Sequence, residues 1–175
     1  MCNRGMSEDR ALSAVAAAGV SHTVLRHGRV AGIEEAAQAR GVAVAAVVKT
    51  IVVRRGEDDY VLVLVPGDRT ISWPRLRAHL GVRRVSMPSA DEAWEATGYV
   101  RGSITPFGAT RPWPVVADTR LVGREITVGG GAPGVAVLLQ ADDAISALGG
   151  SVADVTDPAT SSLTGRGPAR SRSPR

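Results

Sequence analysis

The chain has 175 residues, of which 44% are hydrophobic, a length and composition typical of one globular domain. It contains no apolar run near the ~20 residues that a membrane-spanning helix needs, and its first residues lack the apolar stretch of a secretory signal. Its single cysteine, Cys2, excludes a disulfide bond within the chain, which favours a reducing compartment. We therefore expect a soluble, cytoplasmic protein.

The formal net charge of +4 lies in one part of the chain. Residues 158–175 contain four arginines and no acidic residue; removing these four from the 21 basic residues leaves 17, which equals the 17 acids elsewhere. Any contact of the folded part with nucleic acid must therefore come from a local patch. We expect residues 1–6 to be disordered, residues 7–157 to form one domain, and residues 158–175 to form a disordered basic tail.

Capping and turn residues divide the first half of the chain into short elements. Ser7 is an expected helix cap, Gly19 and Gly41 are expected helix stops, and residues 56–59 read as the turn of a hairpin. The expected elements are a helix over residues 7–18, a strand over 22–26, a helix over 33–40, and hairpin strands over 47–54 and 60–65.

The second half continues with short helices and strands in irregular alternation. Ser72 and Pro74 predict a helix ending at Leu80, and Ser89 with Glu92 predicts a capping box for a helix ending at Thr97. Further strands are expected at residues 82–87, 114–118, 125–128, 135–139 and 152–155, a loop at 99–113, and a last helix at 141–148. Hairpins combined with crossovers favour an α/β (α+β) fold built on a mixed sheet.

The sequence lacks the residue patterns of several common catalytic and binding sites. The three histidines show no zinc-ligand spacing, and the chain has no C-x-x-C, H-E-x-x-H, G-x-S-x-G or Walker motif. The glycines of residues 129–134 precede a predicted strand, whereas a dinucleotide-binding turn precedes a helix. We therefore expect neither a metal nor a cofactor.

Lys49 is the only lysine among 21 basic residues. In a chain that otherwise uses arginine, a retained lysine marks a place where a compact ammonium is required and a guanidinium does not fit. The alternative is a leftover lysine at a strand edge.

The loop over residues 102–108 reads Gly-Ser-Ile-Thr-Pro-Phe-Gly and holds the only phenylalanine. Its glycines let backbone N–H groups approach a ligand, while Pro106 and Phe107 stiffen it. Such a loop can donate hydrogen bonds to a carbonyl or a developing oxyanion. The alternative is a packed connection with Phe107 as its plug.

These segments resemble the YbaK/ProX family, stand-alone relatives of the editing domain inserted in bacterial prolyl-tRNA synthetases. The resemblance runs from about His22 to Asp157 and is carried by five segments in order. They are Val-Val-Lys-Thr-Ile-Val-Val at 47–53, Val-Pro-Gly-Asp-Arg at 65–69, Thr-Gly-Tyr at 97–99 leading into the 102–108 loop, Val-Val-Ala-Asp at 115–118, and the glycine turn before 135–139.

The resemblance implies a curled mixed sheet with flanking helices, and hydrolysis of the ester between an amino acid and the 3′-terminal adenosine of tRNA. It implies that Lys49 holds that adenosine or its phosphate and acts with Gly102 and Gly108. The expected substrate-binding residues are His27, Thr50, Gly67, Ser103, Thr105, Pro106, Phe107, Gly129, Gly130 and Gly131. Some editing relatives carry a histidine near the glycine turn, and this chain has none there.

Other residues have a structural alternative. His27 could contact substrate or be a structural histidine, Asp118 is expected to brace a turn, and Asp68 with Arg69 is expected to form an ion pair. Possible phosphate contacts, or else an ordinary solvated surface, are Arg54, Arg55, Arg69, Arg75, Arg77, Arg83 and Arg84. The tail either adds weak RNA affinity or is inert.

The leading hypothesis is a stand-alone hydrolase that serves translation fidelity by editing mischarged tRNA, such as tRNA-Pro carrying cysteine or alanine. Its expected partners are the 3′ acceptor end of aminoacyl-tRNA and a synthetase, with no membrane or DNA partner. One rival is a non-catalytic module that binds an aminoacyl-adenosine-like ligand or a synthetase. Another is an esterase acting on an unrelated small ester.

Overall fold

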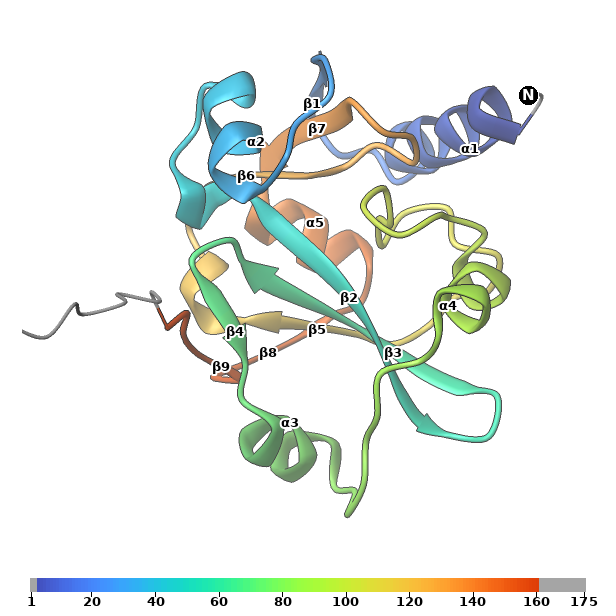
Figure 1. Ribbon diagram of the computed structural model, residues 1–175, viewed down its shortest axis with the longest axis vertical. Coiled ribbons are helices and arrows are strands. Elements are labelled where there is room, and N and C mark those ends of the chain that lie inside the picture. Colours follow the sequence, from blue (N-terminus) through green and yellow to red (C-terminus); the bar gives the residue numbers. More distant parts are fainter. Residues whose placement is uncertain (1–2, 161–175) are drawn as a thin grey trace, which may run out of the picture.

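The computed structural model describes residues 3–160, which form a curled, mixed β structure of three sheets with helices around it (Figure 1). One sheet has the strand order β2-β3-β5-β8, a second β1-β7-β6, and a third pairs β4 with β9. A parallel bridge between Val47 and Thr127 joins the first two sheets. The expected fold class, a curled mixed sheet with flanking helices, is thus confirmed.

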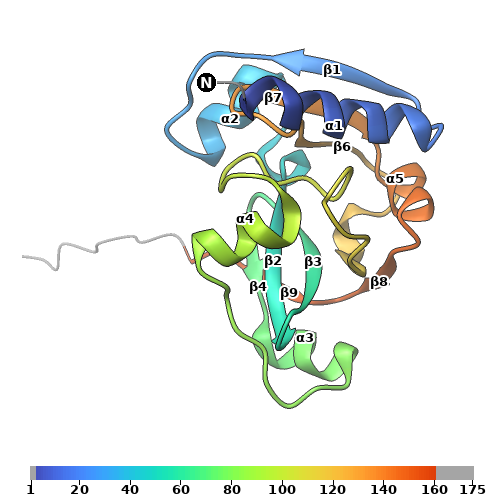
Figure 2. The same ribbon diagram turned by 90° about the vertical axis from the view of Figure 1, so that its right-hand side faces the viewer.

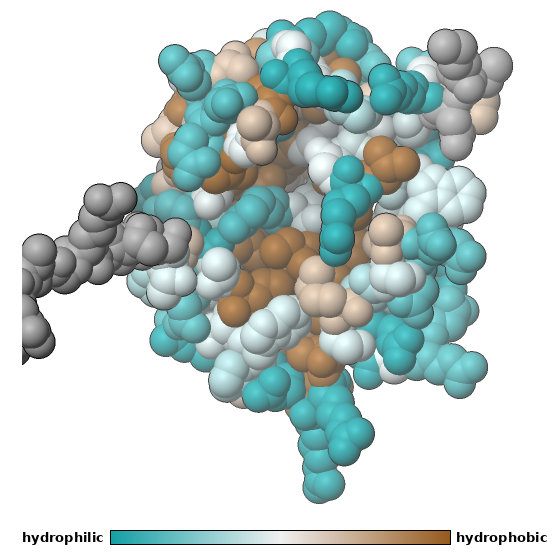
Figure 3. All heavy atoms as spheres, viewed as in Figure 1, coloured by the Kyte–Doolittle hydropathy of each residue, from teal (hydrophilic) through white to brown (hydrophobic). Residues whose placement is uncertain are grey.

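The central sheet is built on the hairpin of β2 (Val48–Gly56) and β3 (Asp59–Pro66), in which Lys49 pairs with Val65. Strand β3 then pairs in parallel with β5 (Val115–Asp118), and β5 with β8 (Ser151–Ala153). The side chains of β3 are buried on both faces, because alternate residues enter two separate hydrophobic clusters. Figure 3 shows that hydrophobic side chains also reach the surface over β2, β3 and β4.

The second sheet covers one end of the central sheet. It contains β1 (His22–Arg26), β7 (Val135–Gln140) and β6 (Glu125–Gly129), all antiparallel. The small pair of β4 (Arg69–Ile71) and β9 (Thr156–Pro158) lies at the end of β3.

The helices occupy the ends and sides of the molecule. Figure 2 shows α1 beside the β1–β7–β6 sheet at one end and α3 at the other. Their bounds are Asn3–Ala17 for α1, Ile33–Arg40 for α2, Trp73–Leu80 for α3, Ala90–Thr97 for α4 and Ala141–Ala147 for α5, with short 3₁₀ turns η1 at Val44–Ala46 and η2 at Thr119–Leu121. Within the part of the chain that the structure describes, no helix is long and apolar enough to cross a membrane.

The folded domain extends beyond both of its expected boundaries, residues 7 and 157. Helix α1 begins at Asn3, so residues 3–6 are helical and Ser7 lies inside the helix, where its hydroxyl donates to the Arg4 carbonyl. Packing explains the helix, because Ala11 and Val15 on its inner face are almost fully buried. At the other end, β9 continues to Pro158 and the Ala159 N–H donates to the Asp68 carbonyl. The expected tail otherwise lies outside the described residues.

The strand expected at residues 82–87 is wrong. Only Ser86 pairs with β2, by two backbone hydrogen bonds to Arg54. A register shift between Arg54 and Gly56 bends this edge of the hairpin, so no ladder extends along it. The short strand β4, after the expected break at Pro66, was not predicted.

The capping box of α4 forms as predicted. Ser89 Oγ accepts from the Glu92 N–H at 3.1 Å, and the Glu92 carboxylate accepts from the Ser89 N–H at 2.7 Å. We expect Ser89→Ala to lower the free energy of unfolding by about 1 kcal/mol, because a helix N–H loses its acceptor. Chemical denaturation of Ser89→Ala beside Ser146→Ala, which removes a hydroxyl from the last turn of α5, checks this, and equal losses would contradict it.

Candidate functional site

A cavity of about 710 Å³ lies where the two larger sheets meet. Its walls come from α1, the β1–α2 connection, α2, the start of β2, the loop after α4 and the β6–β7 turn. The lining residues are Arg4, His27, Gly28, Arg29, Val30, Ala31, Gly32, Ile33, Ala36, Arg40, Val47, Val48, Lys49, Thr50, Arg101, Gly102, Ile104, Gly129, Ala132, Pro133, Gly134 and Val135. The volume falls in the range of small-molecule and cofactor sites.

The charge of this lining is entirely positive. Four arginines, Arg4, Arg29, Arg40 and Arg101, join Lys49, and no aspartate or glutamate is present. A cavity lined by one sign of charge concentrates ligands of the opposite sign. The folded part of the chain is neutral overall, so this local patch is what equips it for an anionic ligand.

Lys49, near the start of β2, is one of the residues that line the cavity. Its ammonium donates a hydrogen bond to the Arg69 carbonyl, at the start of β4. Partial burial lowers the pKa of the ammonium from its usual value, while the nearby Asp68 carboxylate acts in the opposite sense. The lone lysine is thus held in a fixed place rather than left to move in solvent.

The 102–108 loop reaches the cavity with its first residues only. Gly102 and Ile104 line it, and within residues 3–160 their backbone N–H groups donate to no other residue. Gly102 has a φ of 90° and open space beside its Cα, so a ligand can approach the backbone there.

The rest of the loop is packed inside the protein. Ser103, Thr105, Pro106 and Phe107 are buried and do not line the cavity; the Tyr99 hydroxyl donates to the Phe107 carbonyl at 2.7 Å. Phe107 is therefore the expected plug. Gly108 also lies outside the lining. A Cβ there would clash with the Arg10 carbonyl and the Tyr99 hydroxyl, so this glycine allows close packing inside the protein rather than contact with a ligand.

Arg10 of α1 holds this loop in place. Its guanidinium donates to the Gly108 carbonyl at 2.7 Å and to the Gly98 carbonyl at 2.8 Å, and it stacks on the Tyr99 ring. Sequence reasoning missed Arg10, since its partners are about 90 residues away and no local motif announces them.

Of the three glycines expected to bind substrate at the β6–β7 turn, Gly129, Gly130 and Gly131, only Gly129 lines the cavity. Gly129 lines it, and a Cβ there would press on the Ile104 carbonyl, so glycine lets β6 approach the 102–108 loop. Gly130 and Gly131 do not line it; they pack against Val135 and against α1, respectively. Gly134, which was not predicted, lines the cavity in their place.

His27 lines the cavity but both its ring nitrogens have partners. Its Nδ1 lies 2.8 Å from the Gly28 carbonyl, and its Nε2 accepts from Arg40 Nε at 3.3 Å. These contacts fit a neutral ring with the proton on Nδ1. The lone pair that a general base needs is therefore engaged by Arg40.

Arg40 is one of the four cavity arginines that sequence reasoning missed. Besides His27 it donates to Thr127 Oγ1 at 3.1 Å, and within residues 3–160 it forms no ion pair. Burial alone lowers the pKa of its guanidinium. A half-buried cation without a counter-ion supplies attraction that an anionic ligand can use.

Thr50 follows Lys49 in β2 and also lines the cavity. Among the described residues, its Oγ1 is the buried side-chain polar atom without a hydrogen-bond partner. Since a buried hydroxyl without a partner is costly, this position is suited to a ligand group.

Gly67 lies behind the cavity wall rather than in it. A Cβ there would clash with the carbonyls of Val44 and Val47, so glycine lets the β3–β4 turn pack against η1. The expected Asp68–Arg69 ion pair does not form; Arg69 instead donates to Thr156, and Asp68 acts on Lys49 through its charge.

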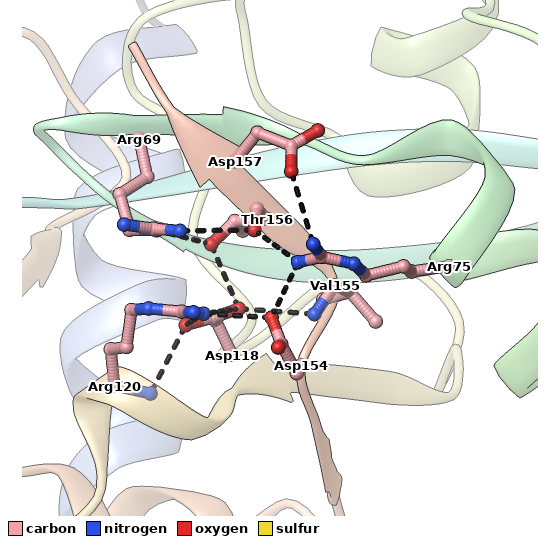
Figure 4. Close-up of polar contacts among 8 residues, drawn as sticks. All are labelled: Arg69, Arg75, Asp118, Arg120, Asp154, Val155, Thr156 and Asp157. Carbon is pink, nitrogen blue, oxygen red and sulfur yellow. Dashed lines mark hydrogen bonds and ion pairs between the residues drawn. The ribbon is translucent and has the colours of Figure 1, made fainter.

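A polar network supports the Lys49 acceptor from behind (Figure 4). Arg69 Nε donates to Thr156 Oγ1 at 2.7 Å, and Thr156 Oγ1 donates to Asp118 Oδ2 at 2.9 Å. The carboxylate of Asp118, which is fully buried, also accepts from the N–H groups of Arg120 and Val155. Asp118 therefore caps η2, as expected for a bracing residue, and ties β5 to β9.

Fold and cavity together define an α+β domain with a cationic pocket, backbone donors at one wall and a fixed lysine at another. Residues 27–147 match the family model of the aminoacyl-tRNA editing domain. The chain belongs to this family, and the resemblance to YbaK/ProX proteins is confirmed.

Individual relatives agree. The chain is 36% identical over 86 residues to the proline–tRNA ligase of Thermosipho africanus, covering 49% of this chain but only 15% of that enzyme. It is 25% identical over 124 residues to the proposed Cys-tRNA(Pro)/Cys-tRNA(Cys) deacylase EbsC of Enterococcus faecalis, covering 70% of this chain and 76% of EbsC.

Solved structures share the whole fold. A proposed trans-editing enzyme for prolyl tRNA synthetase superposes with a TM-score of 0.77 at 28% identity, covering 86% of this chain and 97% of that one. The hypothetical protein APE2540 gives a TM-score of 0.78 at 25% identity, covering 85% and 99%.

Proposed function

We propose that this chain is an aminoacyl-tRNA deacylase that acts in trans on tRNA-Pro carrying a small wrong amino acid, such as cysteine or alanine. The observation that carries the proposal is the convergence of Lys49 and the 102–104 backbone on one cavity without acidic lining. Membership of the editing family and the likeness to EbsC support the same reaction.

The geometry suggests how hydrolysis would proceed. The basic lining receives the 3′-terminal nucleotide, and the Lys49 ammonium binds its phosphate or ribose as a compact charge. The ester carbonyl then faces the N–H groups of Gly102 and Ile104, which stabilise the oxyanion formed when water adds to the carbonyl carbon. Collapse breaks the bond to the ribose oxygen, which takes a proton derived from the water, and releases the free amino acid.

An aminoacyl ester needs no nucleophilic side chain for this reaction, because it is already activated. Holding carbonyl, water and donors in one place contributes several kcal/mol through orientation alone. His27, whose Nε2 is engaged by Arg40, serves in this proposal to shape the cavity rather than to remove a proton.

The test is release of free amino acid from a panel of correctly charged and mischarged tRNAs, with spontaneous hydrolysis measured without protein. We expect release from mischarged tRNA-Pro and little from prolyl-tRNA. Binding of tRNA without release would favour the non-catalytic module, and equal release from a small ester without tRNA would favour the unrelated esterase.

The lowered pKa of Lys49 predicts a pH dependence. Lysine carries its charge below its pKa, so kcat/KM should fall as pH rises through that pKa, starting at lower pH than for an ordinary lysine. A pH profile of kcat/KM, corrected for spontaneous hydrolysis, checks this. The residual activity of Lys49→Arg should lack the alkaline fall, since arginine stays charged; the same fall in both proteins would contradict the assignment to Lys49.

A further inference from the structure

A second hollow, of about 350 Å³, lies between the end of the β2–β3 hairpin and the α3–α4 connection. We call it the arginine groove. It is lined by Arg54, Arg55, Gly56, Arg77, Arg83, Arg84, Val85 and Ser86. Five of these eight residues are arginines and none is acidic, although the folded part of the chain is neutral overall.

The charge of the groove is only partly balanced by its surroundings. Arg54 pairs with Glu92 at 3.0 Å and Arg55 with Asp59 at 2.7 Å. The other three arginines, Arg77, Arg83 and Arg84, form no ion pair within residues 3–160. Guanidinium groups gathered without counter-ions repel each other, and that repulsion is relieved by an anion with several charges.

The groove and the Lys49 cavity lie along one strand. Figure 1 shows β2 running from beside α2 and β6 to the hairpin end near the α3–α4 connection. Lys49 and Arg54 are both in β2, five residues apart, which is roughly 17 Å at the rise of a strand. Stacked nucleotides are about 3 Å apart along a nucleic-acid helix, so this separation spans several nucleotides.

We propose that the arginine groove binds the sugar-phosphate backbone of the tRNA acceptor arm, several nucleotides from the end held in the Lys49 cavity. This proposal about the groove rests on the proposed function, because the polyanion that would occupy the groove is the tRNA substrate of that function. The lining contains no aromatic side chain on which a base could stack, so the groove contacts phosphates independently of sequence. It supplies affinity for the RNA body, while the cavity carries the chemistry.

The test replaces the three arginines without ion pairs in one variant, Arg77→Ser/Arg83→Ser/Arg84→Ser. Affinity for uncharged tRNA is measured against salt concentration. We expect binding at low salt to weaken tenfold or more, and the slope of log K against log salt to become shallower by roughly 2 to 3, since each lost phosphate contact removes about 0.9. Hydrolysis of a short aminoacyl-adenosine ester should remain unchanged.

The matched control removes the same charge elsewhere. Arg26, Arg111 and Arg124 are exposed and lie outside both cavities, so Arg26→Ser/Arg111→Ser/Arg124→Ser should leave most of the affinity and the slope in place. Equal losses in both variants, or unchanged tRNA binding in the groove variant, would overturn the proposal. Loss of short-ester hydrolysis in the groove variant would also overturn it.

These readouts separate the groove from the proposed function. Binding of uncharged tRNA does not require hydrolysis, so wild-type protein that binds tRNA through the groove but releases no amino acid refutes the deacylase alone. Hydrolysis with unchanged tRNA affinity in the groove variant refutes the groove alone.

Discussion

Replacing Lys49 by alanine is expected to lower kcat/KM for the sensitive aminoacyl-tRNA about 100-fold, which corresponds to the loss of one strong charge-assisted contact. The ammonium is held by the Arg69 carbonyl, and the broader guanidinium groups of the cavity arginines do not replace a compact ammonium. The fold should survive, because Lys49 is only half-buried and makes a single side-chain hydrogen bond. Release of labelled amino acid under single-turnover conditions measures the effect.

Two further variants separate charge from packing. Lys49→Met retains most of the apolar stem without the ammonium and should be as inactive as Lys49→Ala. Lys49→Arg retains the charge in a broader group and should also be poor. Thermal unfolding of all three proteins provides the check on folding. Full activity in Lys49→Arg would show that compactness is irrelevant, and full activity in Lys49→Met would remove Lys49 from the reaction.

Local signals explain why much of the fold could be predicted from the sequence. Gly41, Gly81 and Gly98 each end a helix with a positive φ, a conformation that glycine adopts without strain. The hairpin of β2 and β3 is equally local, since its turn and its apolar runs are adjacent in the chain. Signals of this kind do not depend on the rest of the fold.

The cavity could be predicted only in part, because its other contributors come together through tertiary contacts. Lys49 and Gly102 were identifiable by their rarity and by the family motifs, and they do line one cavity. Arg40 and Arg10 carry no such signal: each is one arginine among many, and its importance comes from partners about 90 residues away.

Glycines were the least reliable guide to ligand contact. A glycine in the sequence indicates that something approaches the backbone closely, but not whether that is a ligand or the protein itself. Gly102 faces open space in the cavity, whereas Gly67 meets the carbonyls of η1 and Gly131 meets α1. The distinction depends on packing between distant segments, which a single sequence does not contain.

Asp118→Ala is expected to lower the free energy of unfolding by about 3 kcal/mol, since a fully buried carboxylate leaves several donors without an acceptor. Those donors include the Val155 N–H at 3.1 Å and the Thr156 hydroxyl at 2.9 Å, both on the chain that enters β9. Because Thr156 also binds Arg69, whose carbonyl holds the Lys49 ammonium, the loss also weakens the contact that positions Lys49. Urea denaturation measures the stability.

The control variants distinguish the buried acceptor from mere loss of negative charge. Asp154 pairs with the same Arg120 at 2.8 Å but is half exposed, so Asp154→Ala should have much less effect than Asp118→Ala. Asp118→Asn keeps the size but points an amide NH₂ at groups that are themselves donors, so it should also be destabilising. An ordinary surface variant changes the free energy of unfolding by no more than about 0.5 kcal/mol. If Asp118→Asn changed it by no more than that, the carboxylate would not be what ties β5 to β9.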